Sequence, residues 1–144
     1  TGTSILFFSK KNIPEKYIRS HKAQSGYVNV ASPELTALDL IENEKHIGGL
    51  NRVCTVLNEL VDSIDFDKLN KDFFDLAPTP IYQRLGYILE SVLEREDLAD
   101  IFKSKFPLSL TTRNVPFKIG KSTEDCEIDK KWKIIINQEI EIDE

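Results

Sequence analysis

The stretch TPIYQRLGYILESVL, from Thr79 to Leu93, has the apolar spacing of one continuous helix, yet Gly86 lies at its middle. Glycine in a helix interior is less favourable than alanine by about 1 kcal/mol, so its presence needs a reason. A helical projection directs Leu85 and Ile88 to the core and leaves Gly86 at one border of that face, beside Tyr82. We therefore predict that Gly86 is a packing notch, where a neighbouring backbone approaches this helix closely.

Arg84 lies at the opposite border of the same helical face. An arginine at such a border lays its aliphatic stem along the edge of the core and directs its guanidinium group to an acidic partner. We expect Asp39 to be that partner.

The residues before this stretch predict further helices. Ser32 is a typical N-cap, Pro33 suits the first helical position, and Glu34 is placed favourably against the helix dipole. A long amphipathic helix should follow the glycine pair Gly48 and Gly49. Its apolar residues are spaced by three and four positions: Leu50, Val53, Cys54, Leu57, Leu60, Val61 and Ile64.

Later capping residues extend the helical region. A third helix is expected to begin after Asp65, its cap, and to end at Pro78. Thr79 should cap the next helix, with Pro80 at the first helical position, and one more helix should cover residues 96–106. The middle of the chain is thus predicted to be a central bundle of four to five helices.

Strand patterns occupy both ends of the chain. At the N-terminus, SILFFSK over residues 4–10 is rich in β-forming residues, and two strands within residues 16–32 should flank the turn dipeptide Ser25-Gly26. At the C-terminus, three segments have strand chemistry: LSLTTR (108–113), VPFKIG (115–120) and KKWKIIINQEIEIDE (130–144). In the last of these, alternate positions are apolar: Trp132, Ile134, Ile136, Ile140 and Ile142.

The order of these elements predicts the fold class. Strands, then helices, then strands again, without a repeated βαβ unit, favour an α+β fold over a parallel doubly wound sheet. We expect antiparallel strands at the N-terminus, the helical bundle in the centre and antiparallel strands at the C-terminus, all within one domain over residues 1–144.

The composition is that of one soluble domain. The chain has 144 residues, of which 40% are hydrophobic and 30% charged, and its net charge is -5. This size is sufficient for a core without disulfides or metals. No run is long and apolar enough to span a membrane and no signal-peptide pattern opens the chain, so we expect a cytoplasmic protein. The chain contains no methionine, from which we expect that an upstream part of the protein is missing.

The sequence contains no recognisable cofactor or metal motif. Cys54 and Cys126 belong to no CxxC or Cys/His cluster. His21, in a polar strand, and His46, in a loop that joins two helices, have no companion at metal-ligand spacing. The segment IGGL lacks the Lys-Ser/Thr pair of a phosphate loop and favours a helix C-cap and turn. We expect no metal, no cofactor and no catalytic residue.

A nuclease-like acidic pair of Glu34 and Asp39 is one alternative. Five residues apart on a helix, the two carboxylates would point in directions that differ by about 140°. The pattern therefore favours a first-turn dipole carboxylate and a separate structural acid over a shared metal site, and a divergent enzyme remains the least supported reading.

A nucleic-acid-binding module is another alternative. Basic residues gather in the first strands: Lys10, Lys11, Lys16, Arg19 and Lys22. Such a group suits a phosphate backbone, although lysines also protect the exposed edges of sheets from aggregation. The acidic charge of the whole chain, and the lack of interleaved aromatic and basic residues, favour the edge-strand interpretation.

Four segments, in order, resemble a known family: YVNVASPELTALDLIE, GGLNRV, RLGYILE and WKIIIN. The chain is similar to the C-terminal domain of AbiE-type antitoxins, from abortive-infection systems classed as type IV toxin–antitoxin systems. The residues that carry the resemblance are Ser32, Pro33, Glu34, Leu38, Asp39, Gly48, Gly49, Arg84, Leu85, Gly86, Tyr87, Leu89, Trp132 and Asn137. We expect most of these positions to serve the fold.

The resemblance implies a bacterial antitoxin and transcriptional regulator. The family's usual arrangement is an N-terminal winged helix-turn-helix, which binds promoter DNA, followed by a domain like this one. The implied partner is a nucleotidyltransferase-like toxin, which the antitoxin opposes without forming a stable complex. This chain departs from the full arrangement, because strands rather than a helix-turn-helix are predicted at its start. Promoter binding is therefore expected to need the missing upstream domain.

Overall fold

The computed structural model describes residues 18–23, 26–106, 108–109 and 111–140. Its helices are α1 (Pro33–Glu42), α2 (Glu44–Ile47), α3 (Leu50–Leu60), α4 (Lys71–Phe74), α5 (Thr79–Tyr87) and α6 (Glu96–Lys105). Its strands are β1 (Ile18–Ala23), β2 (Gly26–Ala31), β3 (Val115–Pro116), β4 (Glu127–Asp129) and β5 (Ile134–Ile136). Helices with a small three-stranded sheet near the C-terminus confirm the predicted α+β class.

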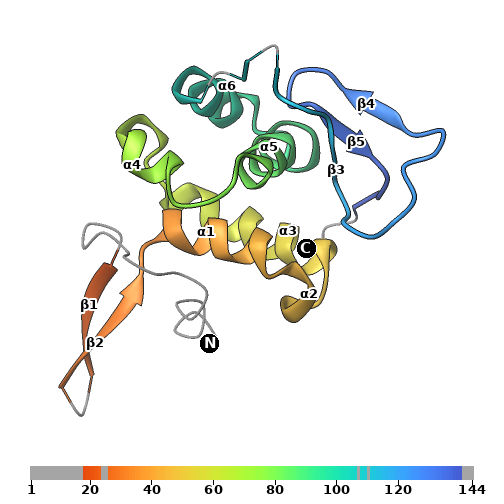
Figure 1. Ribbon diagram of the computed structural model, residues 1–144. Helices are drawn as coiled ribbons and strands as arrows, with labels where there is room; N and C mark the ends of the chain where they lie inside the picture. The colour runs from red at the N-terminus through yellow and green to blue at the C-terminus, as the bar shows by residue number, and fades with distance from the viewer. Residues whose placement is uncertain (1–17, 24–25, 107, 110, 141–144) are drawn as a thin grey trace.

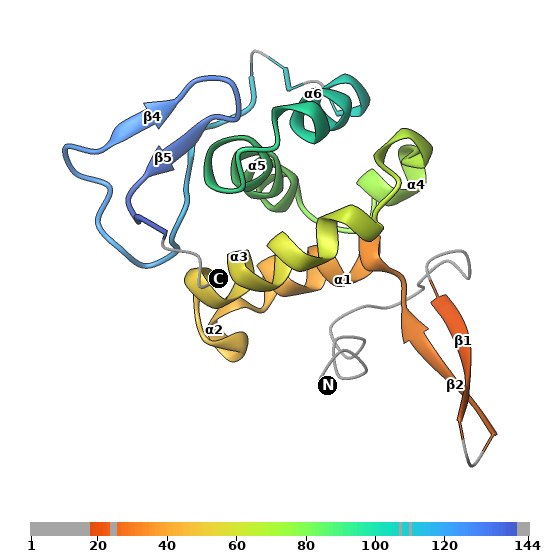
Figure 2. The same cartoon turned by 180° about the vertical axis from the view of Figure 1, so that it is seen from behind.

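Helix α5 occupies the centre of this arrangement (Figure 1). It contacts α1, α6 and β5, and the view from behind shows the same neighbours around it (Figure 2). Every residue from Ile81 to Leu89 is buried. The sequence predicted one face of this helix towards the core, but α5 is enclosed because the C-terminal sheet covers the side that the other helices leave open.

The predicted cap of α1, the predicted turn at Gly48 and the predicted apolar face of α3 are confirmed. Ser32 is the N-cap of α1, and its hydroxyl accepts a hydrogen bond of 3.4 Å from the backbone N–H of Leu35. Gly48 ends α2 with a φ of 117°, a left-handed conformation that glycine adopts without strain. Of the seven apolar positions predicted around α3, all except Leu60 are buried.

Two details of the helical region differ from the prediction. No single helix follows Asp65. Instead, a 3-10 turn over Phe66–Lys68 precedes the four-residue helix α4. The physical reason is Asn70, whose side chain accepts a hydrogen bond of 3.1 Å from Asp72 N–H and so replaces the backbone acceptor that a continuous helix needs. His46 also lies in the short helix α2 rather than in a loop.

The ends of α5 differ from the prediction as well. Pro78 is the N-cap residue, and Thr79 is already the first helical residue, without a side-chain capping bond. The helix then continues into a π-helical turn over Ile88–Val92, where Leu93 N–H donates to the carbonyl of Ile88 over 2.8 Å. Such π turns are rare and insert one extra residue into the turn.

The C-terminal sheet has the strand order β3-β5-β4. Strand β4 is antiparallel to β5, as expected, but β3 is parallel to it, so the prediction of purely antiparallel strands was wrong. Within residues 108–113, none of the described positions is a strand. The reason is that Lys133 Nζ donates to the carbonyls of Ser109 and Thr112, which are held as a turn instead of a ladder.

A two-stranded hairpin lies at the other end of the fold (Figure 1). Strand β1 pairs antiparallel with β2, in a register that opposes Ile18 to Ala31 and Ala23 to Gly26. His21 is in β1, as predicted. The predicted strand over residues 4–10 lies outside the described residues.

Candidate functional site

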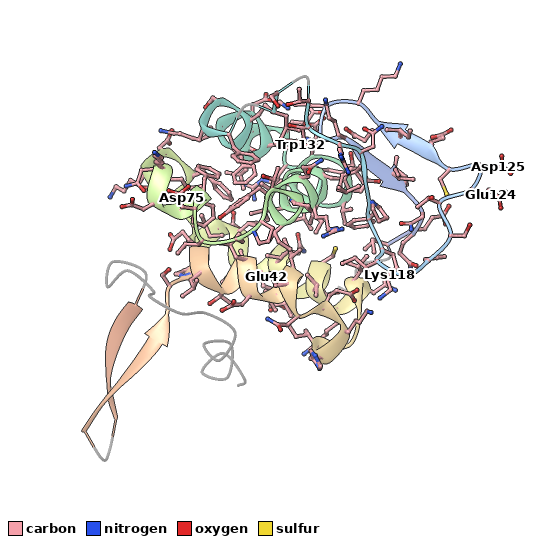
Figure 3. The ribbon with its side chains drawn as sticks, viewed as in Figure 1. Glu42, Asp75, Lys118, Glu124, Asp125 and Trp132 are labelled. Carbon is pink, nitrogen blue, oxygen red and sulfur yellow. The ribbon has the colours of Figure 1, made fainter. Side chains whose placement is uncertain are left out.

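The predicted site residues converge most clearly where α5 meets the C-terminal sheet. We call this region the α5–sheet interface, formed by Gln83, Arg84, Gly86, Pro116 and Trp132. Trp132, which is labelled in Figure 3, is 0% exposed. Its indole lies directly on Gly86. A Cβ atom added to Gly86 would overlap the six-membered ring of Trp132. The packing notch is confirmed, but a tryptophan side chain fills it rather than a backbone.

Polar groups surround the edge of the Trp132 ring. The indole Nε1 donates to a carboxylate oxygen of Glu90 over 3.3 Å, and Lys131 Nζ lies 2.6 Å from the same oxygen. Lys103 Nζ lies 5.0 Å from the ring centroid, within the range of a cation–π contact. Burial and the neighbouring charge of Lys131 lower the pKa of Lys103. These contacts fix the orientation of the indole against α5.

Gln83 is the residue of this interface that the sequence analysis missed. It is 1% exposed, and its Nε2 amide faces the carbonyls of Arg113, Trp132 and Lys133 at 3.0, 3.2 and 3.3 Å. A buried amide that satisfies carbonyls of a distant segment joins the two parts of the chain. The only signal in the sequence is a polar residue inside an apolar helical run.

Arg84 does not pair with Asp39, so that expectation was wrong. Its Nε donates to the carbonyl of Pro116 over 3.0 Å. Burial lowers the pKa of Arg84, and the nearby charge of Glu44 acts in the opposite direction. The reason for the difference is the C-terminal sheet, which brings the Pro116 carbonyl to the border of α5 where Arg84 lies.

A second polar cluster lies beside Arg84. The carboxylate of Glu44, which is 5% exposed, receives two hydrogen bonds from Lys118 Nζ, at 2.8 and 3.0 Å. Asn137 accepts from Lys118 N–H over 2.8 Å and donates to the carbonyls of Lys118 and Lys121. This cluster connects α2 to the residues after β3 and to the end of β5. Asn137 therefore has a structural role.

Tyr87 belongs to the same region. Its ring packs edge-on against Phe117, with the ring centroids 5.0 Å apart. Burial raises the pKa of Tyr87. The remaining motif residues lie elsewhere: Ser32, Pro33 and Glu34 begin α1, Gly48 and Gly49 join α2 to α3, and Leu38, Asp39, Leu85 and Leu89 are buried within the helices.

The basic residues of the alternative site are only partly described. Lys10, Lys11 and Lys16 lie outside the described residues, whereas Arg19 and Lys22 belong to β1. Glu34 and Asp39 differ in environment, because Asp39 is 0% exposed and Glu34 is half-buried at the start of α1. Among the described residues, no group of three or more His, Cys, Asp or Glu side chains is placed to hold a metal ion.

The described helices include none with the length and apolar character needed to cross a membrane.

A sequence model of the AbiEi antitoxin C-terminal domain matches residues 7–91. The matched segment runs through α1, α3 and α5, and it ends before Trp132 and Asn137, which the resemblance had included. Searches of curated proteins and of solved structures gave no significant match.

Proposed function

Because the chain belongs to the AbiEi antitoxin C-terminal domain family, we propose that it is the non-enzymatic antitoxin domain of a bacterial type IV abortive-infection system. It counters a nucleotidyltransferase-like toxin in the cytoplasm. The observation that carries this proposal is the family match, which covers more than half of the 144-residue chain.

The geometry of the α5–sheet interface supports a role without catalysis. Gln83 Nε2 and Arg84 Nε are both bonded to backbone carbonyls, and Lys118 is bonded to Glu44. These groups hold the fold together, so the motif residues keep the helices and the sheet in one arrangement. Any action on a toxin would then come from the surface of that arrangement.

The partners follow from the same family. We infer that the domain antagonises the toxin without a stable complex and that an upstream winged helix-turn-helix domain binds the promoter DNA.

The test is co-expression of the chain with the nucleotidyltransferase-like toxin encoded beside it, with growth as the measurement. We expect the wild-type chain and the surface variant Asn58→Ala to restore growth, since Asn58 is exposed on α3. The overpacked variant Gly86→Leu should restore it poorly, because its fold is impaired. Failure of the wild-type chain and of the intact protein to restore growth would refute the proposal.

A second candidate function is nucleic-acid binding by the β1–β2 hairpin. The hairpin projects from the helices in both views (Figures 1 and 2), and it carries Arg19 and Lys22. A gel shift with duplex DNA tests it. Substitution of Lys10, Lys11, Lys16, Arg19 and Lys22 by alanine should abolish the shift, and an unchanged shift would exclude the hairpin as the binding surface.

A further inference from the structure

Strand β5 ends earlier than its sequence predicts. Apolar residues recur at alternate positions up to Ile142, with an interruption at Gln138, but pairing with β4 ends at Ile136, opposite Glu127. Within the described part of the chain, the backbone N–H groups of Gln138, Glu139 and Ile140 have no hydrogen-bond acceptor. A strand-like sequence with unpaired backbone donors is a template for another strand.

Two hollows lie against this unpaired segment. The first, of about 640 Å³, is bordered by the residues before β4, including Asp125 and Glu127. The second, of about 420 Å³, is bordered by the π-helical turn at the end of α5, including Ser91 and Val92. Both are also lined by Ile136, Gln138 and Glu139, so they adjoin each other along this segment. We call the pair of hollows the C-terminal groove.

The charge of the C-terminal groove is predominantly negative. Asp125, Glu127 and Glu139 line it, and none of the three forms an ion pair with a described residue. Its one lysine, Lys121, donates from Nζ to Oε1 of Gln138 over 3.0 Å. Glu124 and Asp125 lie at the outer end of the loop before β4 (Figure 3). Unpaired carboxylates on an open groove attract a cationic ligand.

A mostly buried tyrosine lines the same groove. Tyr87 borders the second hollow and is only 7% exposed. Its hydroxyl group forms no hydrogen bond with a described residue, and it is not among the fully buried polar atoms, so it reaches the hollow. This hydroxyl is therefore available to a ligand in the groove, independently of the carboxylates.

We propose that the C-terminal groove binds an extended, lysine- or arginine-rich segment of a partner protein, which adds as a strand beside residues 137–140. Its carbonyls accept from the free N–H groups of Gln138 and Ile140, which point to the same side of an extended segment. Its basic side chains pair with Asp125, Glu127 and Glu139. Addition of a strand to an exposed sheet edge is a common mode of peptide recognition, in which the backbone supplies affinity and side chains supply specificity.

The acidic lining of the C-terminal groove favours a basic protein segment over a nucleic acid or a second copy of this chain. A nucleic-acid backbone would be repelled by Asp125, Glu127 and Glu139. A second copy of this chain carries the same groove charge, so two such grooves would repel each other. The inference goes beyond the proposed antitoxin function, because that function requires no stable protein complex.

The test uses the full chain and synthetic octapeptides that alternate a basic with an apolar residue, such as (Lys-Val)4 and (Arg-Ile)4. Binding is followed by amide chemical shifts and by hydrogen exchange. The expected result is selective protection of the Gln138 and Ile140 amides, with no protection by (Glu-Val)4. Salt should weaken binding, because the contributing charges are exposed.

Matched variants locate the interaction. Glu127→Gln combined with Glu139→Gln should weaken peptide binding by about three- to tenfold, the range expected for two exposed charge pairs. Tyr87→Phe should weaken it further while leaving the fold unchanged. The control is Glu59→Gln, which removes an exposed charge from α3, outside the groove, and should leave binding unchanged.

Three results would overturn this inference. The first is that none of the basic peptides protects these amides. The second is equal protection by the acidic peptide. The third is protection that depends on protein concentration without peptide, which would place a second copy in the groove. All three results are measured by peptide binding to the isolated chain. They are therefore distinguishable from a failure of the chain to restore growth in the co-expression test.

Discussion

Gly86 and Trp132 fit together as notch and filler: the indole ring lies where the side chain of any other residue at position 86 would have to be. The two residues are distant in sequence, and their contact joins α5 to the segment that leads into β5. Trp132 is 0% exposed as a result. Gly86 lowers the intrinsic stability of helix α5, but it leaves the space in which the large Trp132 ring is buried.

Gly86→Ala should destabilise the protein by about 1–3 kcal/mol, because the added methyl group overlaps the Trp132 ring. Without this overlap, alanine would stabilise the helix by about 1 kcal/mol. Urea denaturation measures the difference, with Asn58→Ala on the exposed face of α3 as the control. In a Trp132→Leu background the cost should fall, since the smaller side chain leaves room. A stability gain in the wild-type background would contradict the packing account.

Gln83→Met should cost about 1–3 kcal/mol, because the carbonyls of Arg113, Trp132 and Lys133 lose their donor. Gln83→Glu should be worse at neutral pH, since it places a carboxylate against carbonyl oxygens. Its pKa would be raised, so protonation at about pH 4 should reduce the difference between the two variants. Urea denaturation at both pH values tests this, and equal costs at both would exclude direct contact with the carbonyls.

Glu44→Gln should destabilise the protein by about 1–3 kcal/mol, because Lys118 loses a charged acceptor and Arg84 loses a neighbouring negative charge. Lys118→Met alone should also be destabilising, since it leaves the buried Glu44 carboxylate uncompensated. The double variant should cost less than the sum of the two single variants. Strict additivity in thermal or urea unfolding would show that the two side chains do not interact.

Ser32→Ala should cost about 1 kcal/mol, because α1 loses the acceptor for the N–H of Leu35. Thr79→Ala is the matched comparison, because Thr79 was expected to cap α5 but makes no capping bond. Its effect on the free energy of unfolding should be much smaller. Equal losses for the two variants would show that Thr79 contributes to capping in solution.

The two cysteines should differ in reactivity. Burial raises the pKa of Cys54 to about 12, whereas Cys126 is only half-buried. A thiol reagent such as DTNB should therefore modify Cys126 in the folded protein and Cys54 only after denaturation. Cys126→Ser should abolish the fast reaction. A fast phase that persists in this variant would show that Cys54 is accessible.

The same burial predicts a pH dependence of stability. Above about pH 9 the unfolded chain loses the Cys54 proton while the folded chain keeps it, so stability falls as the pH rises towards the folded pKa. The stability advantage of wild type over Cys54→Ala should shrink over this range. An advantage that is constant with pH would contradict the raised pKa.

Local patterns in the sequence were sufficient for features that depend on neighbouring residues. The cap of α1 at Ser32, the turn at Gly48 and the buried face of α3 were all predicted, because each arises from interactions within a few residues. The resemblance to the antitoxin family also follows from sequence, and the match over residues 7–91 confirms it. The notch at Gly86 was recognisable as a violation of helix propensity.

Long-range contacts determined what the sequence did not show. The partner of Gly86 is Trp132, the partner of Arg84 is the Pro116 carbonyl, and Gln83 contacts backbone more than twenty residues away. Such pairings depend on how the C-terminal sheet packs against α5. The apolar periodicity within either segment does not predict which residues of the two segments come into contact. The parallel pairing of β3 with β5 has the same origin.

The sequence by itself determined the α+β class, the principal helices and the family. Only the tertiary structure decided that α5 is enclosed on all sides, that the motif residues Arg84, Gly86 and Trp132 meet at one interface, and that β5 stops at Ile136 beside an acidic groove. The physical reason is that helix caps and apolar periods are local free-energy preferences, whereas burial of a whole helix and the end of a strand depend on which distant surfaces come into contact.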